Sequence, residues 1–173
     1  MNIGLKQLSI QDGMDVYAML QELPKDENGF VNGCYGMSFT EYQQWLMKSD
    51  NTARGIGLAD WMVPQTIYWL YVDGLPVGIG KLRHRLTDKL REEGGHGGYA
   101  IRPSCRNKGY GKLLLKLMIR EASALGIDRL LLTVKNHNIP SIKVALANGG
   151  VIEKVNGQSH YIWVDCRPQG GYP

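Results

Sequence analysis

One stretch of the chain, residues 97–126, constrains the fold more than any other. Gly97–Ile101 is short and apolar and is predicted to be a strand, which Pro103 ends because proline cannot donate to a sheet ladder. A polar loop containing Gly109 and Gly111 follows. The rest of the stretch places its apolar residues at helical spacing. The sequence therefore predicts a strand, a glycine loop and an amphipathic helix in direct succession.

This succession is an arrangement that can bind phosphate. The first turn of a helix has N–H groups without internal partners, and the helix dipole adds positive charge there. Glycines let a pyrophosphate approach the backbone closely, and Arg106, Lys108 and Lys112 add cationic side chains. The alternative interpretation is that the glycines serve only the turn.

Two common phosphate loops do not fit this glycine loop. No Gly-Lys-Ser or Gly-Lys-Thr closes it, as a Walker loop requires. Leu114 stands where a dinucleotide fingerprint needs its third glycine. The pattern that remains is Arg-x-x-Gly-x-Gly, which spans Arg106–Gly111.

The remaining elements indicate a single α/β domain with a mixed sheet. A length of 173 residues suits one domain with a hydrophobic core. The segment between the first two helices, Lys25–Met37, is predicted to be a loop. The strand that follows the long helix is expected to run parallel to the Gly97 strand through a right-handed crossover. In chain order, the other expected elements are strands at 3–8, 66–72, 77–84, 94–101, 129–134, 151–155 and 160–164 and helices at 9–23, 38–48, 87–93 and 139–148.

Charge and cysteine content narrow the class of protein. The net charge of +4 fits an anionic ligand such as a nucleotide cofactor, and without a dense Lys/Arg run it does not favour nucleic acid. Three cysteines without metal-ligand spacing predict reduced thiols, no metal site and a cytoplasmic protein. The N-terminal residues lack a signal-peptide pattern, and no apolar run reaches about 18 residues, so no membrane partner is expected.

The Arg106–Gly111 loop resembles the coenzyme A pyrophosphate loop of the GNAT superfamily of acetyltransferases. Downstream, Asn138–Ser141 matches the Asn-x-x-Ala/Ser sequence that opens a helix in that family. The resemblance implies a GNAT acyltransferase fold over residues 1–173, with a mixed central sheet of six to seven strands and about four helices. Wider motifs resemble a little-characterised bacterial branch of predicted acetyltransferases: Glu27–Phe30, Tyr68–Leu70, Arg83–His84, Gly94–Tyr99 and Ile101–Ser104.

By this resemblance the acetyl donor is acetyl-CoA, and CoA is a product. In the family, a bulge splays two parallel strands, so strand N–H and C=O groups are left free for the pantetheine arm. Asn138 would lie near the thioester, or serve only as a helix cap. The implied cofactor residues are Tyr99, Ala100, Ile101, Arg106, Asn107, Lys108, Gly109, Tyr110, Gly111, Lys112, Asn138 and Ser141.

Catalytic groups are harder to assign. Many family members carry a tyrosine seven positions after the asparagine as general acid, and here that position is Ala145. A thiol has a pKa of about 8.5, so its thiolate leaves at neutral pH without a proton donor. A lysine-like amine is neutral in only about one molecule in 2,500 at pH 7, and deprotonating it costs roughly 4.6 kcal/mol. His96 is therefore the candidate base, and Tyr161 the candidate acid. The alternatives are a core histidine and a packed aromatic residue.

The acceptor side is predicted in the loop between the first two helices, where this fold usually contacts its acceptor. Glu27, Asn28 and Phe30 lie there, and His84 is a further candidate. The alternatives are a solvated loop and a structural histidine. The predicted function is an N-acetyltransferase in which a primary amine of a small molecule or peptide attacks the thioester directly. A weakly catalytic CoA-binding sensor or interaction module is the alternative, and a nucleotide-binding regulator rests on the glycine loop alone. The closing hairpin permits a homodimer.

Overall fold

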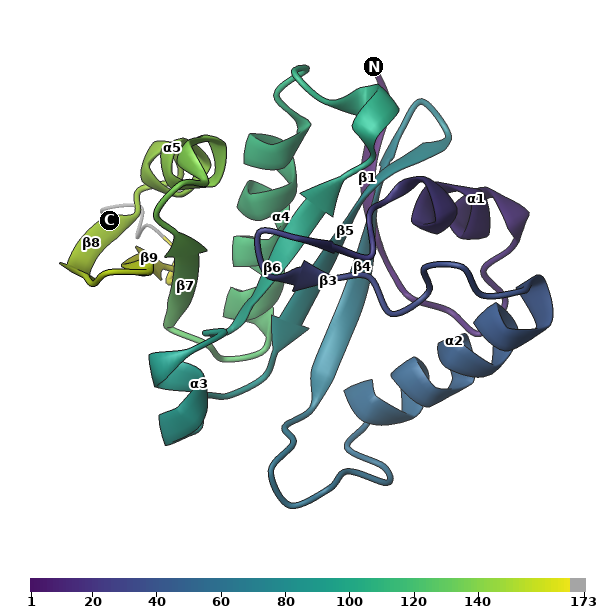
Figure 1. Cartoon of the computed structure of the whole chain (residues 1–173), viewed down its shortest axis with the longest axis horizontal. Helices are drawn as coiled ribbons and strands as arrows, with labels where there is room; N and C mark the ends of the chain where they lie inside the picture. The colour runs from purple at the N-terminus through teal and green to yellow at the C-terminus, as the bar shows by residue number, and fades with distance from the viewer. Residues whose placement is uncertain (169–173) are drawn as a thin grey trace.

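The strands form two main sheets and one short hairpin (Figure 1). The computed structural model describes residues 1–168. The first sheet has four antiparallel strands in the order β1-β4-β5-β6, and the second has the order β7-β9-β8. The strands are β1 (Ile3–Gln7), β2 (Asp26–Glu27), β3 (Phe30–Val31), β4 (Gln65–Val72), β5 (Leu75–Arg83), β6 (Gly97–Ile101), β7 (Arg129–Lys135), β8 (Val151–Val155) and β9 (Ser159–Asp165).

Helices cover both faces of the first sheet, because its strands alternate apolar side chains to either side. On β5, Ile79 packs with α1 and α2, whereas Leu82 packs with α4. Gly80 lets α4 approach closely, since a Cβ there would lie 2.5 Å from the Met118 sulfur. The helices are α1 (Met14–Glu22), α2 (Phe39–Ala53), α3 (Asp88–Glu92), α4 (Tyr110–Ala124) and α5 (Ile139–Ala147), with a 3-10 turn, η1 (Pro103–Cys105). The predicted mixed α/β fold is confirmed, with seven strands in the two main sheets and five α-helices in residues 1–168, at the positions expected from the sequence, where the family resemblance implied about four.

The two main sheets separate between β6 and β7, which are not paired in either sheet. Just before β6, the backbone N–H of His96 donates to the Leu131 carbonyl at 2.9 Å, and the Leu131 N–H donates to His96 Nδ1 at 2.9 Å. Beyond this link the strands diverge, as Figure 1 shows. The separation creates a cavity that a continuous sheet would not have.

The segment between α1 and α2 differs from the prediction of a loop. Within it, β2 and β3 pair as a two-stranded hairpin whose turn residues, Asn28 and Gly29, have φ of 55° and 84°. Two successive positive φ values are typical of a tight turn that suits the twist of the strands. The hairpin lies in front of β6 (Figure 1). Among residues 1–168, no helix is long and apolar enough to cross a membrane.

Candidate active site

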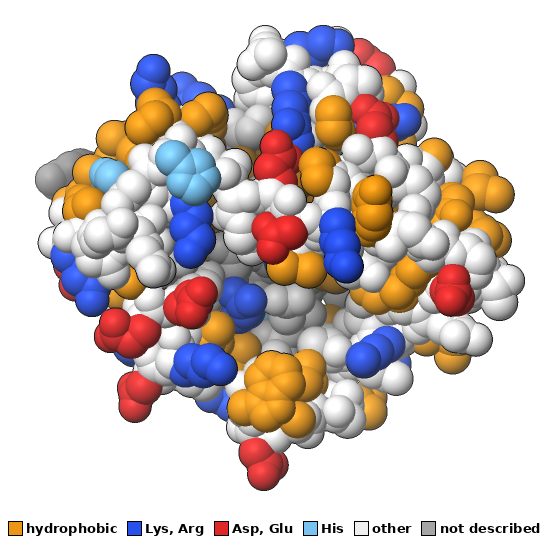
Figure 2. Space-filling view, viewed as in Figure 1, with side chains coloured by type: hydrophobic (Ala, Val, Ile, Leu, Met, Phe, Trp, Pro, Cys, Tyr) orange, Lys and Arg blue, Asp and Glu red, His pale blue; other side chains and the backbone are white. Residues whose placement is uncertain are grey.

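A cavity of about 600 Å³ lies between the two sheets, beneath the β2–β3 hairpin. Figure 2 shows this face hollowed near its centre, with cationic side chains visible inside the hollow. Its walls include Gly97–Tyr99 of β6, Leu132–Lys135 of β7 and Glu27–Val31 of the hairpin. A volume of this size suits a small ligand together with the end of a second one.

The N-terminus of α4 carries a row of free main-chain donors. Gly109 is the N-cap residue with φ 79°, and no side chain caps the helix. Within residues 1–168, the N–H groups of positions 107–112 have no hydrogen-bond partner. A Cβ on Gly109 would have no heavy atom within 4 Å, so the approach to these amides is open. Such a row at a helix start is suited to binding an anion.

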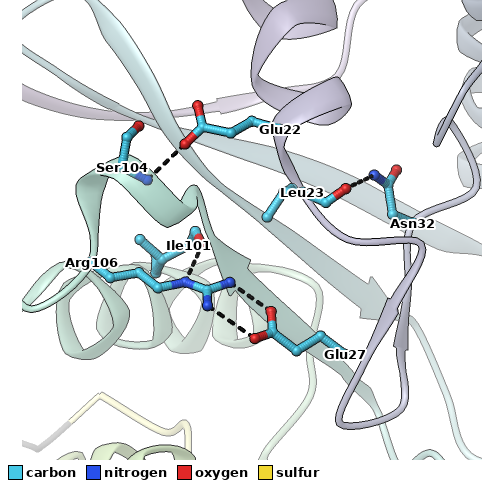
Figure 3. A network of polar contacts seen from close by, with 7 residues as sticks. All are labelled: Glu22, Leu23, Glu27, Asn32, Ile101, Ser104 and Arg106. Atoms are coloured by element: carbon cyan, nitrogen blue, oxygen red, sulfur yellow. Dashed lines mark hydrogen bonds and ion pairs between the residues drawn. The ribbon is translucent and has the colours of Figure 1, made fainter.

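The side chain of Arg106 points to the hairpin. Its Nη1 and Nη2 donate to the two Glu27 carboxylate oxygens at 2.9 and 2.6 Å, and its Nε donates to the Ile101 carbonyl at 3.0 Å (Figure 3). Nearby, the Ser104 N–H donates to Glu22 at 2.7 Å (Figure 3). The α1–β3 segment is therefore tied to the glycine loop by two carboxylates.

Tyr99, Asn138 and Ser141 line the cavity where α5 begins. The Asn138 side-chain oxygen, Oδ1, accepts from the Ser141 N–H at 3.4 Å, so Asn138 is a helix cap that also borders the cavity. The Tyr99 hydroxyl donates to Ser141 Oγ at 3.4 Å. By contrast, Ala145 is fully buried, and the position where many family members carry tyrosine lies in the core.

The two candidate catalytic side chains are both held by hydrogen bonds. His96 is 6% exposed and does not line the cavity, and burial, followed by Arg91 and Arg83, lowers its pKa to about 4. It is therefore neutral at neutral pH, and its contacts are those of a residue that links β6 to β7. Tyr161 does line the cavity, and its hydroxyl donates to the Glu92 carbonyl at 2.6 Å.

The acceptor candidates divide into two groups. Glu27, Asn28 and Phe30 all line the cavity, and Asn28 Oδ1 lies 2.8 Å from His137 Nε2 in the segment between β7 and α5. His84 does not line the cavity, and its Nε2 lies 2.7 Å from Thr66 Oγ1. The structure thus brings the hairpin residues to the site and leaves His84 beside it.

Sequence reasoning missed several cavity residues, and among them are two cations of β5, Lys81 and Arg83. The available signal was two cationic residues two positions apart near the end of an otherwise apolar strand. It also missed the β2–β3 hairpin, although Asn28-Gly29 is a strong hairpin signal. Among residues 1–168, no group of three or more His, Cys, Asp or Glu residues is placed to hold a metal ion.

Comparison with known proteins defines the class. The family model for the acetyltransferase (GNAT) family matches residues 30–149, so the chain belongs to that family and the family prediction is confirmed. The chain is thus an acetyltransferase by family. A search of curated proteins found no match.

Solved structures share the fold at low sequence identity. A GNAT acetyltransferase from Streptococcus pneumoniae is 19% identical, covering 94% of this chain and 98% of that chain, with a TM-score of 0.61. The N-acetyltransferase PseH from Campylobacter jejuni, in complex with acetyl coenzyme A, is 15% identical over 95% and 99% of the two chains, with a TM-score of 0.63. Mutant forms of the spermidine/spermine N-acetyltransferase SpeG from Vibrio cholerae are 14% identical over 95% of each chain, with a TM-score of 0.61.

Proposed function

We propose that the protein is an N-acetyltransferase that transfers the acetyl group of acetyl-CoA to a primary amine by direct attack. The observation that carries this proposal is the cavity between two separated sheets, together with the free amides of positions 107–112. The family membership and the acetyl-CoA complex of a protein with the same fold support the choice of donor.

The residues present fit the donor at its diphosphate. The exposed glycine loop leaves the α4 amides open, and Lys108 and Lys112 lie exposed beside them. Since Arg106 is bound to Glu27, we assign diphosphate binding chiefly to main-chain N–H groups and these lysines. The free edge of β6 at Tyr99–Ile101, on the side away from β5, would pair with the pantetheine arm.

The donor supplies a thioester, and the protein holds the amine beside it. A C–N bond forms to the acetyl carbon and the C–S bond breaks. The amine gives up its proton to water, and the thiolate leaves as CoA. Tyr161, whose hydroxyl is at the cavity wall, is our proposed proton donor to the thiolate: its single O–H proton turns from the Glu92 carbonyl to the sulfur and is replaced from water. The buried, hydrogen-bonded ring of His96 supports a structural role for that residue rather than that of the base.

Thiol release from acetyl-CoA with a panel of amines tests this function, with mass spectrometry of the product. Growth of free thiol with an N-acetylated product of matching mass supports it. Binding of CoA without release of thiol from acetyl-CoA in the presence of any amine would instead support the second candidate, a CoA-binding sensor. The buried Ala145 favours this candidate because it leaves the usual position of the general acid without a hydroxyl.

Two further expectations stay predictions. The three cysteines are free thiols, which agrees with the predicted cytoplasmic location. The edge strand β8 exposes Val151, Ile152 and Val155, which is the surface we propose for a homodimer. Sedimentation velocity over a range of concentrations checks the second expectation.

A further inference from the structure

Two cationic side chains, Lys81 and Arg83, line the cavity from β5. They lie two positions apart and so share one face of the strand. Lys81 Nζ donates to the Val31 carbonyl at 2.5 Å and lies 4.6 Å from the centre of the Phe30 ring. Arg83 Nη1 donates to the carbonyls of the glycines that precede His96, Gly94 and Gly95, at 3.1 and 3.2 Å. All of these partners are uncharged.

Neither cation has a counterion. Within residues 1–168, no carboxylate lies within 4.0 Å of Lys81 or Arg83. Burial, and then the charge of Arg83, lowers the pKa of Lys81 to about 8, and burial also lowers the pKa of Arg83. Burying charge without a partner is unfavourable, and two like charges side by side add to the cost. The protein therefore maintains a positive site that an anion would stabilise.

The free donors of these groups reach open space. Arg83 Nε and Nη2 have no hydrogen-bond partner in the described part of the chain. No fully buried side-chain nitrogen or oxygen there lacks a partner, so these two nitrogens have solvent-accessible surface, and the residue that carries them lines the cavity. A guanidinium edge of this kind matches the two oxygens of a carboxylate or phosphate.

Each carboxylate that lines the cavity is either paired with another cation or exposed to solvent. Glu27 is paired with Arg106, and Glu92 has a side chain 74% exposed whose Oε2 lies 3.9 Å from Lys154 Nζ. Glu93 is also exposed. None of them neutralises the two β5 cations.

The position of the β5 cations separates them from the diphosphate loop. Lys81 lies opposite Gly98 in the β5–β6 pairing, three residues before β6 ends at Ile101. At a rise of about 3.3 Å per residue, this places Lys81 about 10 Å before that end, while the glycine loop begins beyond it. Arg83 lies further still in the same direction. These cations therefore lie at the end of the cavity away from the glycine loop.

We propose that Lys81 and Arg83 bind the negatively charged group of the acceptor, which is a small primary amine that also carries a carboxylate or a phosphate. The proposal rests on the N-acetyltransferase function and narrows its acceptor. A neutral amine would leave the two cations uncompensated, and a polyamine would add charge of the same sign.

The test compares acceptors matched apart from the anionic group, with kcat/KM expressed per unprotonated amine because the carboxamide also lowers the pKa of the amine. Each common amino acid is assayed beside its carboxamide, and phosphoethanolamine beside ethanolamine, with thiol release from acetyl-CoA as the signal. The acid of at least one pair is expected to have the higher kcat/KM. The amino acid and phosphoethanolamine arms distinguish carboxylate from phosphate. If the neutral member of every pair has the same kcat/KM as its acid, the proposal is overturned and the N-acetyltransferase function still holds.

Variants of Lys81 separate charge from packing. Lys81→Met keeps the length of the side chain and is expected to lower the acid-to-amide ratio of kcat/KM by about 10- to 100-fold, because a charge-assisted hydrogen bond is lost. Lys81→Arg keeps the charge and should retain most of the ratio. Lys116→Met, on the exposed side of α4, is the control and should leave the ratio unchanged. An unchanged ratio in Lys81→Met would contradict the assignment.

A binding experiment tests the anion site even if no amine is acetylated. The absence of acetylation would count against the N-acetyltransferase function alone. N-acetylglycine, N-acetylglycinamide and inorganic phosphate are titrated into the CoA-bound protein by calorimetry. We expect N-acetylglycine or phosphate to bind the wild type at least tenfold more tightly than Lys81→Met, and the amide to bind neither protein well. If neither anion binds the wild type, or if both proteins bind it equally, the proposal is overturned.

Discussion

Replacing Gly109 with aspartate tests whether the α4 amides hold a diphosphate. Gly109 has φ 79° and ψ 3°, and a Cβ there meets nothing within 4 Å. Left-handed backbone costs an L-residue about 1–2 kcal/mol, and a carboxylate beside the positive end of a helix returns about 0.3–1 kcal/mol. We therefore expect the free energy of unfolding to fall by no more than about 1.7 kcal/mol.

The effect on donor affinity is larger. A carboxylate about 5 Å from two phosphate charges is repelled by about 2 kcal/mol in a medium close to water, and by more where solvent is excluded. The exposure of Gly109 favours the lower value, which corresponds to a Kd for CoA raised about 30-fold. Because the repulsion is electrostatic, the loss should shrink when the salt concentration is raised to about 1 M.

Isothermal titration of CoA into three proteins measures this effect. Gly109→Asn is the matched control, since its side chain has the size of aspartate without the charge, and its Kd should stay within about threefold of the wild type. Gly126→Asp carries the same change at φ 79° at the other end of α4 and should bind CoA normally. Equal affinities of the Asp and Asn variants at position 109 would refute the assigned loop.

Three further predictions concern the same site. His96→Ala removes a buried acceptor and should cost about 1–3 kcal/mol in urea unfolding. In the wild type, the pKa of His96 is lower in the folded than in the unfolded state, so its neutral form stabilises the fold above about pH 6.5. As the pH falls towards 4, the free energy of unfolding should drop by up to about 3 kcal/mol, and His96→Ala should lack this pH dependence. Glu27→Gln breaks a half-exposed ion pair worth about 0.2–1 kcal/mol and frees Arg106, so calorimetry should show up to about fivefold tighter CoA binding; weaker binding would contradict this. Gly97→Ala, at φ 140° with its Cβ 2.0 Å from a carbonyl oxygen of β5, should destabilise by about 3 kcal/mol or more in urea, whereas Gly98→Ala has room beside Phe30 and should cost much less.

Elements with strong local patterns were predictable from the sequence. The helix expected at 139–148 is α5 (Ile139–Ala147), and Asn138 caps it as its position indicated. The strand expected at 66–72 is β4 (Gln65–Val72). In both cases the signal lies in neighbouring residues, either as a capping residue or as a run of β-branched and aromatic side chains.

Long-range pairings were not predictable in the same way. Arg106 and Glu27 are 79 residues apart, and nothing in the local pattern of either one indicates that they bind each other. His96 looked like a free base beside the cofactor strand, but Leu131, 35 residues away, occupies its Nδ1. Whether Lys81 faces solvent or a cavity depends on which two neighbouring strands separate. The sequence of a single strand does not indicate this separation. Side-chain roles at this site are therefore set by topology more than by motif.

The β2–β3 hairpin connects the proposed diphosphate loop with the proposed acceptor site, so we expect donor and acceptor occupancy to be thermodynamically linked. Its Glu27 binds Arg106 at the start of that loop, and four residues later its Val31 carbonyl accepts from Lys81. If a diphosphate draws Arg106 away from Glu27, the hairpin that positions Lys81 is altered too. Reciprocity then requires that whatever factor CoA imposes on acceptor affinity, the acceptor imposes on CoA. Titrating CoA with and without the acceptor, and the acceptor with and without CoA, should give the same ratio of dissociation constants.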